Sequence, residues 1–247
     1  MKNLIATTAL VLAIASPAFA QSKLSDAERA DFRAEVRAYL LENPEVLMEA
    51  ISVLEDRRTD DAAASDIALL QSNADEILND PASWVGGNPD GDITVVEFMD
   101  YRCGYCKKAF EDVAELIESD GNIRFIVKEF PILGPQSELA SRFAVAVLQI
   151  EGAQTYETAH DALMGMKVDV TEASLAALAA EIGIKDMAAV TERMNAPEVT
   201  SVIEANRALA QRLDINGTPT FVIDQTLVRG YVPLEGMRQI VDGQRKG

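Results

Sequence analysis

The sequence predicts an α/β fold in which a small mixed sheet is interrupted by an all-helical insertion and preceded by an N-terminal helical extension. Two apolar strands, ITVVEFM (93–99) and IRFIVKEF (123–130), flank a helical segment, and this βαβ pattern makes the strands parallel. Residues 136–212 carry apolar side chains at helical spacing, and so do residues 24–58. The chain therefore reads as one mixed domain with a helical appendage.

The appendage covers residues 21–80 and begins with two expected helices. Ser25 and Glu28 form the capping-box pattern at the start of the first. Asn43 and Pro44 interrupt the apolar spacing, which predicts that Asn43 is the N-cap of the second helix and Pro44 its first residue.

The rest of the extension is less regular. Residues 59–66 are acidic and rich in small side chains, which predicts either a flexible linker or a solvated helix. A third helix is expected at about residues 66–79, before Asp80-Pro81.

Beyond the βαβ unit, turn signals and strands alternate. The glycine-rich run 86–91 is typical of a turn. TPTFVID (218–224) and TLVRGYV (226–232) are expected to pair as a hairpin, and residues 234–241 to form a final helix.

The first twenty residues have the layout of a secretory signal peptide. Lys2 supplies positive charge, residues 4–15 are apolar, and Ala18-Phe19-Ala20 matches a cleavage site before Gln21. The apolar run is too short to cross a membrane, although a permanent N-terminal anchor is the alternative. We expect a mature protein exported to an oxidising compartment, the periplasm.

The chain is strongly acidic. Its net charge of −18 would become −19 on removal of residues 1–20, which contain one lysine and no acid. So negative a surface argues against nucleic acid or anionic lipid as a partner. It is compatible with a protein that meets many unrelated proteins.

Both cysteines of the chain, Cys103 and Cys106, lie in the run DYRCGYCKKAF (100–110). A bridge closing so short a ring stabilises a fold by about 2 kcal/mol, against about 3 for a fifteen-residue loop. A structural staple is therefore a weak explanation. A metal site would need further ligands, and the chain has one histidine and no other cysteine, although a copper(I) site using methionines is an alternative.

A Cys-x-x-Cys pair in a βα turn is the thioredoxin-like redox motif. Cys103 would sit at a helix N-terminus, where unpaired N–H groups and the helix dipole stabilise a thiolate. We expect Cys103 to be the nucleophile and Cys106 the thiol that resolves the mixed disulfide. No cofactor beyond this redox-active pair is expected.

The run VVEFMDYRCGYC (95–106) resembles the DsbA-like thiol–disulfide oxidoreductases, and GTPTF (217–221) resembles their cis-proline loop. The resemblance extends from about residue 83 to the C-terminus and includes the helical insertion at about 136–212. It implies a thioredoxin fold for the catalytic domain, residues 81–247. It also implies that Pro219 is cis and faces the cysteines, leaving the backbone of Thr218 free to pair with a substrate strand.

The resemblance assigns further residues. Glu97 would lie buried beneath the disulfide and relay a proton to or from Cys106; the alternative is a glutamate at the sheet edge, facing water. Lys128, on the neighbouring strand, would be either its charge partner or solvent-exposed. Gly104 and Tyr105, between the cysteines, are expected to contact substrate.

Tyr105 stands where the best-known oxidases of the family carry histidine, which helps to hold the thiolate. This departure predicts a less depressed pKa for Cys103 and a less oxidising disulfide. The single histidine of this chain, His160, lies in the helical insertion and is expected to be structural.

The segment VRAYLLENPEVLMEAISVLEDRR (36–58) is similar to the extension of suppressor-of-copper-sensitivity protein C, which can join protomers into oligomers, including trimers. Its apolar stripes are too small to form a core alone. We therefore expect a homo-oligomer, with a trimer favoured. Several tethered sites raise the effective concentration that an isomerase needs.

Thr218 points to the same activity, since isomerases and reductases of the family commonly carry threonine before the cis-proline. The expected function is a disulfide isomerase or reductase that acts on unfolded or misfolded secreted proteins. A membrane redox partner of the DsbD, ScsB or DsbB type would set its redox state. The alternatives are a dithiol oxidase and, outside enzymes, a copper-binding protein or a chaperone-like holdase.

Overall fold

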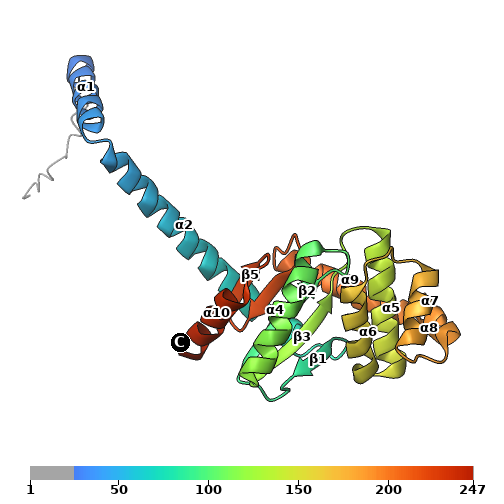
Figure 1. The fold of residues 1–247 in the computed structure, drawn as a ribbon. Helices are drawn as coiled ribbons and strands as arrows, with labels where there is room; N and C mark the ends of the chain where they lie inside the picture. Colours follow the sequence, from blue (N-terminus) through green and yellow to red (C-terminus); the bar gives the residue numbers. More distant parts are fainter. Residues whose placement is uncertain (1–24, 247) are drawn as a thin grey trace, which may run out of the picture. The chain divides into compact units, whose positions relative to one another are not determined.

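The computed structural model describes residues 25–246 and divides into two units, one ending at Arg57 and the other beginning at Arg58. Figure 1 shows the element order. The expected signal peptide, residues 1–20, lies outside the described residues. Within residues 25–246, no helix combines the length and apolar character needed to cross a bilayer.

The first unit contains α1 (Asp26–Glu42) and the beginning of α2 (Glu45–Ser72). The capping box is confirmed, because the Ser25 side chain accepts from the Glu28 N–H and the Glu28 carboxylate accepts from the Ser25 N–H. The predicted role of Asn43 is wrong. Its side-chain amide donates to the Tyr39 carbonyl at 2.9 Å, so it ends α1 and does not cap α2.

Helix α2 runs without interruption through residues 59–66 and ends at Ser72. Of the two alternatives for this segment, the solvated helix is confirmed; its alanines favour that state. The predicted third helix at 66–79 is wrong in its start, because α2 occupies its first half and only α3 (Ala74–Leu78) remains separate. Within the second unit, Asp66 of α2 pairs with Arg229 at 2.8 Å.

The second unit is built on a five-stranded mixed sheet with the order β1-β3-β2-β4-β5. The two predicted strands, β2 (Ile93–Met99) and β3 (Ile123–Glu129), are parallel neighbours, and Glu97 stands opposite Val127. The predicted hairpin is confirmed in shortened form as β4 (Thr220–Ile223) and β5 (Thr226–Arg229).

One strand was not expected from the sequence. β1 (Trp84–Gly87) pairs antiparallel with β3, so the first two glycines of the predicted turn belong to a strand. The Trp84 ring lies so close to Gly86 that a Cβ there would collide with it, and Gly87 has φ +64°. Gly86 therefore allows the Trp84 ring to pack against the backbone, and Gly87 allows a left-handed backbone conformation within the strand. In the sequence, two adjacent glycines of this kind look like a turn.

Helices cover both faces of the sheet. Helices α4 (Gly104–Asp120) and α10 (Leu234–Lys246) pack on the face that includes Val95 and Met99. The other face packs against α2, α3 and α9. The predicted insertion is confirmed as five helices: α5 (Pro135–Glu151), α6 (Ala153–Gly165), α7 (Glu172–Glu181), α8 (Met187–Met194) and α9 (Pro197–Arg212). Figure 1 shows α5, α6, α7 and α8 gathered beside the sheet.

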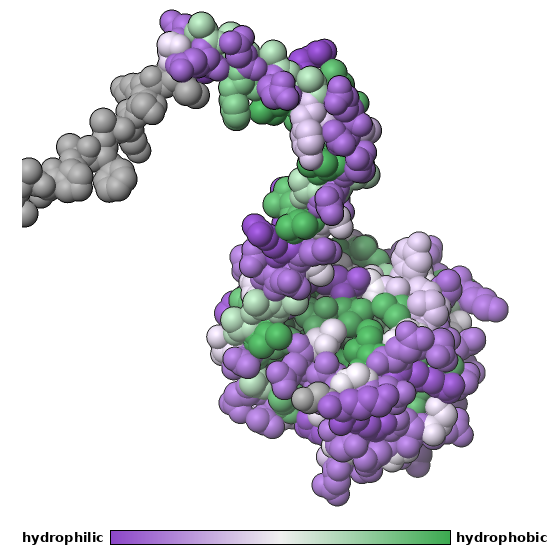
Figure 2. Space-filling model, turned by 90° about the vertical axis from the view of Figure 1, so that its left-hand side faces the viewer, coloured by the Kyte–Doolittle hydropathy of each residue, from purple (hydrophilic) through white to green (hydrophobic). Residues whose placement is uncertain are grey.

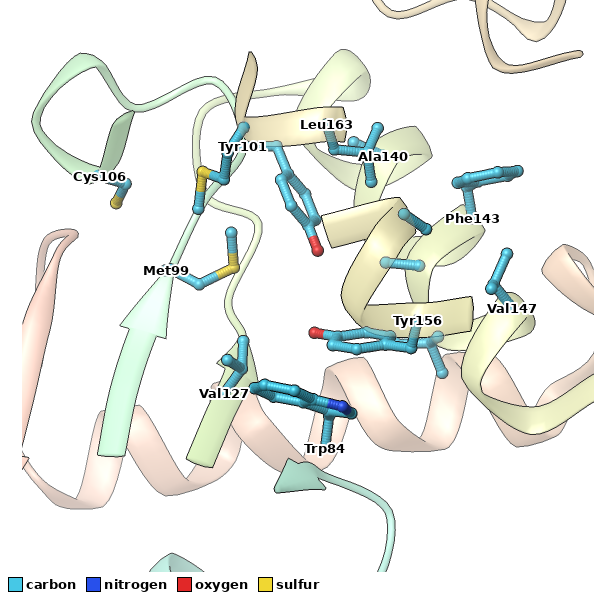
Figure 3. Packing of buried hydrophobic residues seen from close by; sticks show 14 of the residues in the cluster. Trp84, Met99, Tyr101, Cys106, Val127, Ala140, Phe143, Val147, Tyr156 and Leu163 are labelled. Atoms are coloured by element: carbon cyan, nitrogen blue, oxygen red, sulfur yellow. The ribbon is translucent and has the colours of Figure 1, made fainter. Parts of the chain in front are cut away.

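The larger core joins the sheet to this insertion. Trp84 of β1 packs on Tyr156 of α6 with ring centroids 5.6 Å apart, and Tyr101 lies above them at the end of β2. Figure 3 shows the Tyr101 and Tyr156 hydroxyls directed into the same space, between the sheet and the helices. The core thus carries polar groups at its centre, directly behind the turn that holds the cysteines.

Candidate active site

The two cysteines lie where the sequence places them, between β2 and α4. Cys103 is the N-cap residue of α4, and its Sγ accepts a hydrogen bond from the Cys106 N–H at 3.4 Å. Both are free thiols, and Cys106 is fully buried one turn into the helix. Sulfur in an N-cap position receives the amide groups that open the helix, which favours its anion.

The pKa of Cys103 is lowered from 9.0 to about 5. The largest cause is a hydrogen bond with the Cys106 side chain, helped by Thr218 and by the N–H groups of Tyr105 and Cys106, while burial opposes the shift. Cys103 is therefore mainly a thiolate at pH 7. The lowered pKa of Cys103 arises here without a histidine. That it is less depressed than in the oxidases that carry histidine at the position of Tyr105 stays a prediction.

Cys106 shows the opposite behaviour. Its pKa is raised far above that of a free thiol, first by the hydrogen bond to Cys103, then by burial and by the charge of Glu97. One thiol of the pair is thus ionised while the other keeps its proton. This division is what a nucleophile and a resolving thiol require.

The cis-proline loop faces the nucleophile. The Thr218–Pro219 peptide bond is cis, as expected, and the Cys103 Sγ lies 3.1 Å from the Thr218 carbonyl oxygen, to which the thiol donates in its protonated form. The Pro219 carbonyl accepts from the Gly230 N–H at 2.9 Å. The loop borders a hollow of about 380 Å³ that also includes Asn216. Pairing of the Thr218 backbone with a substrate strand stays a prediction.

Glu97 is buried beneath the cysteines, with 3% of its surface exposed, so the alternative of a water-facing edge residue is wrong. Its Oε1 atom has no hydrogen-bond partner within the described residues. Burial, and secondarily the negative charge of Cys103, raises the pKa of Glu97 to about 8. A carboxyl group in this state can both give and take a proton near neutral pH.

Lys128 is neither the partner of Glu97 nor solvent-exposed, and both predicted alternatives are wrong. Its ammonium group is buried and donates to the Asp80 carboxylate at 2.7 Å and to the Glu76 carbonyl at 2.8 Å. In the sheet it stands beside Phe98, one position out of register with Glu97. Because side chains alternate along a strand, Lys128 and Glu97 point to opposite faces.

The residues between the cysteines are accessible. A Cβ added to Gly104 would meet nothing within 4 Å, and Tyr105 is 64% exposed. The Tyr105 ring stacks on Tyr231 at 6.4 Å, and the Lys108 ammonium lies 4.4 Å from the centre of the Tyr231 ring. The stacked rings of Tyr105 and Tyr231 therefore form an aromatic surface beside Cys103, next to the cis-proline loop.

Asp100 was not identified from the sequence. It is buried, and its carboxylate accepts from the N–H groups of Arg102, Ile132 and Leu133 at 2.7 to 3.0 Å. The Ile132 and Leu133 side chains are exposed. Asp100 thus connects the cysteine turn to the loop that contains Ile132 and Leu133. The signal available in the sequence was an acidic residue directly after a buried strand.

Behind the turn lies a buried polar cluster that the sequence did not indicate. Glu129, at the end of β3, accepts hydrogen bonds from the Tyr101, Tyr156 and Ser141 hydroxyls at 2.7 to 2.8 Å. Burial raises the pKa of Glu129 to about 7, although these three donors oppose the shift. The cluster links the end of β3 to α5 and α6.

His160 belongs to the same cluster. Its Nδ1 lies 3.0 Å from the Tyr101 hydroxyl, and burial lowers its pKa to about 4, which makes it neutral at pH 7. This environment is consistent with the structural role expected for it. Among residues 25–246, no group of three or more His, Cys, Asp or Glu side chains is arranged to hold a metal ion.

Comparison with known families gives the affiliation of the chain. The model of the DSBA-like thioredoxin domain matches residues 94–242, more than half of the sequence. The chain belongs to the DsbA-like family. Residues 28–60 match a second model, the copper resistance protein ScsC N-terminal domain, which agrees with the similarity seen in the sequence of the extension.

Individual members of the family resemble this chain over most of its length. A thioredoxin-like oxidoreductase from Silicibacter pomeroyi is 44% identical, with a TM-score of 0.66, over 70% of this chain and 98% of that one. A linker-deletion mutant of Proteus mirabilis ScsC is 28% identical, with a TM-score of 0.68, over 92% and 99%. Disulfide bond formation protein D of Bacillus subtilis is 25% identical over 65% of this chain and 76% of its own.

Proposed function

We propose that this DsbA-like protein is a periplasmic thiol–disulfide oxidoreductase that acts on the disulfides of secreted proteins, in the direction of isomerisation or reduction. The observation that carries the proposal is the position of Cys103, ionised at the N-terminus of α4 and facing the cis Thr218–Pro219 bond. The layout of residues 1–20 supports export.

The chemistry follows from the two unequal thiols. The Cys103 thiolate attacks a substrate disulfide, forming a mixed disulfide and releasing one substrate thiolate, which takes a proton from solvent. In isomerisation, a different substrate thiolate attacks the substrate sulfur of the mixed disulfide, so that a new substrate disulfide forms and the Cys103 thiolate leaves. In reduction, Cys106 loses its proton and attacks Cys103, so that the pair is oxidised and the substrate becomes a dithiol.

Glu97 is suited to accept the proton of Cys106 in the second step. The negative charge of Cys103 is one cause of its raised pKa, and formation of the mixed disulfide removes that charge. The carboxyl group then becomes more acidic and its anion more available. Glu97 thus becomes a base when Cys106 has to be deprotonated.

The first unit supports the isomerase reading. Helix α1 has no buried residue, and Phe32, Val36 and Tyr39 leave 40% or more of their surface exposed on one helical face. Leu47, Ile51 and Leu54 of α2 form a similar exposed stripe. Figure 2 shows green apolar side chains among purple polar ones along these helices. We infer that other copies of the chain cover these stripes, as a trimer or another oligomer.

A second candidate, a dithiol oxidase, is favoured by one observation. A pKa of about 5 stabilises the reduced form of the pair, and a stabilised reduced form makes the disulfide a stronger oxidant. The partners would differ accordingly. An isomerase would be kept reduced by a membrane protein of the DsbD or ScsB type, and an oxidase would be reoxidised by one of the DsbB type.

Two assays separate the candidates. Recovery of active ribonuclease from its scrambled form measures isomerisation, and recovery from the reduced form with the oxidised protein measures oxidation. Cys103→Ala is expected to abolish both, whereas Cys106→Ala should retain attack and accumulate the mixed disulfide. Full activity of Cys103→Ala would refute the redox proposal, and oxidation without isomerisation would select the oxidase.

The assembly is tested separately by the mass in solution. Phe32→Glu and Ile51→Glu place charges in the two stripes and are expected to yield monomers with weakened isomerisation. Ala34→Glu and Ser52→Glu, also exposed on α1 and α2 but outside the stripes, serve as matched controls. A wild-type protein that is monomeric at assay concentration would exclude the oligomer and favour the oxidase.

A further inference from the structure

A cavity of about 390 Å³ opens between α4, α6 and β1 in the second unit. It is distinct from the hollow beside the cis-proline loop, since the two share no lining residue. Small-molecule sites in proteins have volumes of roughly 300 to 1,000 Å³. The cavity is therefore large enough for a small organic molecule, and its lining shows which class would fit.

The walls are apolar and largely aromatic. Trp84 and Phe125 come from the sheet, and Phe110, Val113 and Ile117 come from successive turns of α4. Such walls take up a hydrocarbon or aromatic body and hold it by burial of apolar surface.

The mouth carries three exposed carboxylates and no positive charge. Glu118 lies on α4, and Glu157 and Asp161 lie one turn apart on α6. Lysine and arginine are absent from the residues that line the cavity. Burial, together with the charge of Glu157, raises the pKa of Asp161, so these carboxylates interact unfavourably with one another. A cation at the mouth would relieve that repulsion.

A second, independent feature lies in the interior. Glu97 borders the cavity, is 97% buried by surface area, and has an Oε1 atom without a hydrogen-bond partner among the described residues. Unpartnered buried polar atoms are rare in folded proteins and commonly meet a ligand or water. The interior therefore presents a hydrogen-bonding group that a polar end of a ligand can reach.

We propose that this cavity is a binding site for an amphipathic organic amine whose ammonium group lies among Glu118, Glu157 and Asp161 and whose apolar body carries a hydroxyl group to Glu97. The body occupies the aromatic walls. The site goes beyond the proposed redox function, and its occupancy needs neither cysteine to react.

The ligand class is tested with four small probes added to the isotopically labelled, reduced protein, with binding followed by the amide resonances of α4 and α6. Tyramine has the ammonium, the aromatic body and the hydroxyl. 2-Phenylethylamine lacks the hydroxyl, tyrosol replaces the ammonium with a neutral alcohol, and 4-hydroxyphenylacetate replaces it with a carboxylate. Tyramine is expected to bind about three- to tenfold more tightly than 2-phenylethylamine, the range of one neutral hydrogen bond, and 4-hydroxyphenylacetate most weakly.

Substitutions assign each end of the ligand. Glu118→Gln or Asp161→Asn should weaken tyramine about two- to fivefold and leave tyrosol unchanged, because only the ammonium interacts with the mouth. Glu172→Gln, an exposed acid on α7, is the matched control. Glu97→Met should remove the advantage of tyramine over 2-phenylethylamine, because the hydroxyl then has no partner.

A further variant tests where the ligand binds. Ala114 borders the mouth on the exposed side of α4, so Ala114→Trp should close the cavity and abolish the shifts, whereas Ala176→Trp on α7 should not. The proposal is overturned if tyramine causes no saturable shift up to about 10 mM, a concentration corresponding to very weak binding. It is also overturned if 4-hydroxyphenylacetate binds as well as tyramine, or if Ala114→Trp binds like the wild type. None of these outcomes depends on disulfide exchange.

Discussion

The Sγ atom of Cys103 lies 3.1 Å from the carbonyl oxygen of Thr218, a residue 115 positions later in the chain. This contact brings together two segments of the second unit that are far apart in the sequence. The fold produces it because β2 and β4 are antiparallel neighbours, so that the turn after β2 faces the loop before β4. Helices α5 to α9 are inserted between these strands without disturbing their pairing.

Thr218 should lower the pKa of Cys103 in addition to lying opposite it. Thr218→Val removes a hydroxyl that helps to lower the pKa of Cys103, so the pKa should rise while the fold is retained. Thr218→Ser, which keeps the hydroxyl, is the matched control and should resemble the wild type. The pH dependence of Cys103 alkylation measures the shift. An unchanged midpoint in Thr218→Val would show that the Thr218 hydroxyl contributes nothing and that the Cys106 side chain and the backbone N–H groups hold the thiolate.

The ionisation of Cys103 should also appear in the stability of the reduced protein. Its pKa is lowered in the folded state to about 5, so between about pH 5 and pH 9 the unfolded chain binds a proton that the folded one lacks. The stability of the reduced form should therefore rise with pH across this window and fall as pH drops towards 5. Urea unfolding of the wild type and Cys103→Ser at several pH values measures the difference in stability, which should grow from pH 5 to pH 9 and be constant below pH 5.

Glu97 should contribute with the opposite sign. Because its pKa is raised to about 8, the folded protein holds a proton that the unfolded chain releases above about pH 4.5, and stability is lost as pH rises from there to 8. Glu97→Gln should thus be more stable than the wild type, by up to about 3 kcal/mol at pH 7. Its gain should shrink at pH 4. Resolution of the mixed disulfide should slow in the same variant, while the first attack by Cys103 remains.

The sequence was sufficient to predict the βαβ unit, the helical insertion and the cysteine site, because each depends on local patterns. The cysteine spacing defines the turn, and alternation and helical periodicity define the elements around it. It was not sufficient for β1, whose glycines look like a turn. A glycine is required at position 86 because the Trp84 ring packs where a Cβ would lie, and this contact is seen only in the structure.

The wrong prediction that Lys128 pairs with Glu97 also arose because the three-dimensional contacts are not visible in the local sequence. Adjacency of two strands was correctly predicted, but the register was not, and a shift of one residue changes the face to which a side chain points. The helix through residues 59–66 was only one of two alternatives in the sequence. The roles of Asp100 and Glu129 depend on contacts with residues far along the chain, which no local pattern contains.

The register can be tested directly with Lys128→Met. Because Lys128 pairs with Asp80 on the face opposite Glu97, its removal should cost about 2 kcal/mol, less than a fully buried pair since Asp80 is partly exposed. The pKa of Cys103 and the rate of disulfide exchange should not change. A double variant, Lys128→Met with Asp80→Leu, should recover part of the stability. A shift in the Glu97 titration in Lys128→Met would instead support the pairing that the structure excludes.

Tyr156 should hold the helical insertion to the sheet through Glu129. Its hydroxyl donates to the Glu129 carboxyl at 2.7 Å, and this hydrogen bond works against the burial that raises the pKa of that group to about 7. Tyr156→Phe should therefore raise the pKa further. The variant should lose about 1 to 2 kcal/mol at pH 8, where the wild-type carboxylate uses the bond most, and less at pH 5, where the group is protonated. Tyr39→Phe, exposed on α1, is the control, and urea unfolding at both pH values is the measurement. An equal loss at pH 5 and pH 8 would mean that Tyr156 stabilises the core by packing alone.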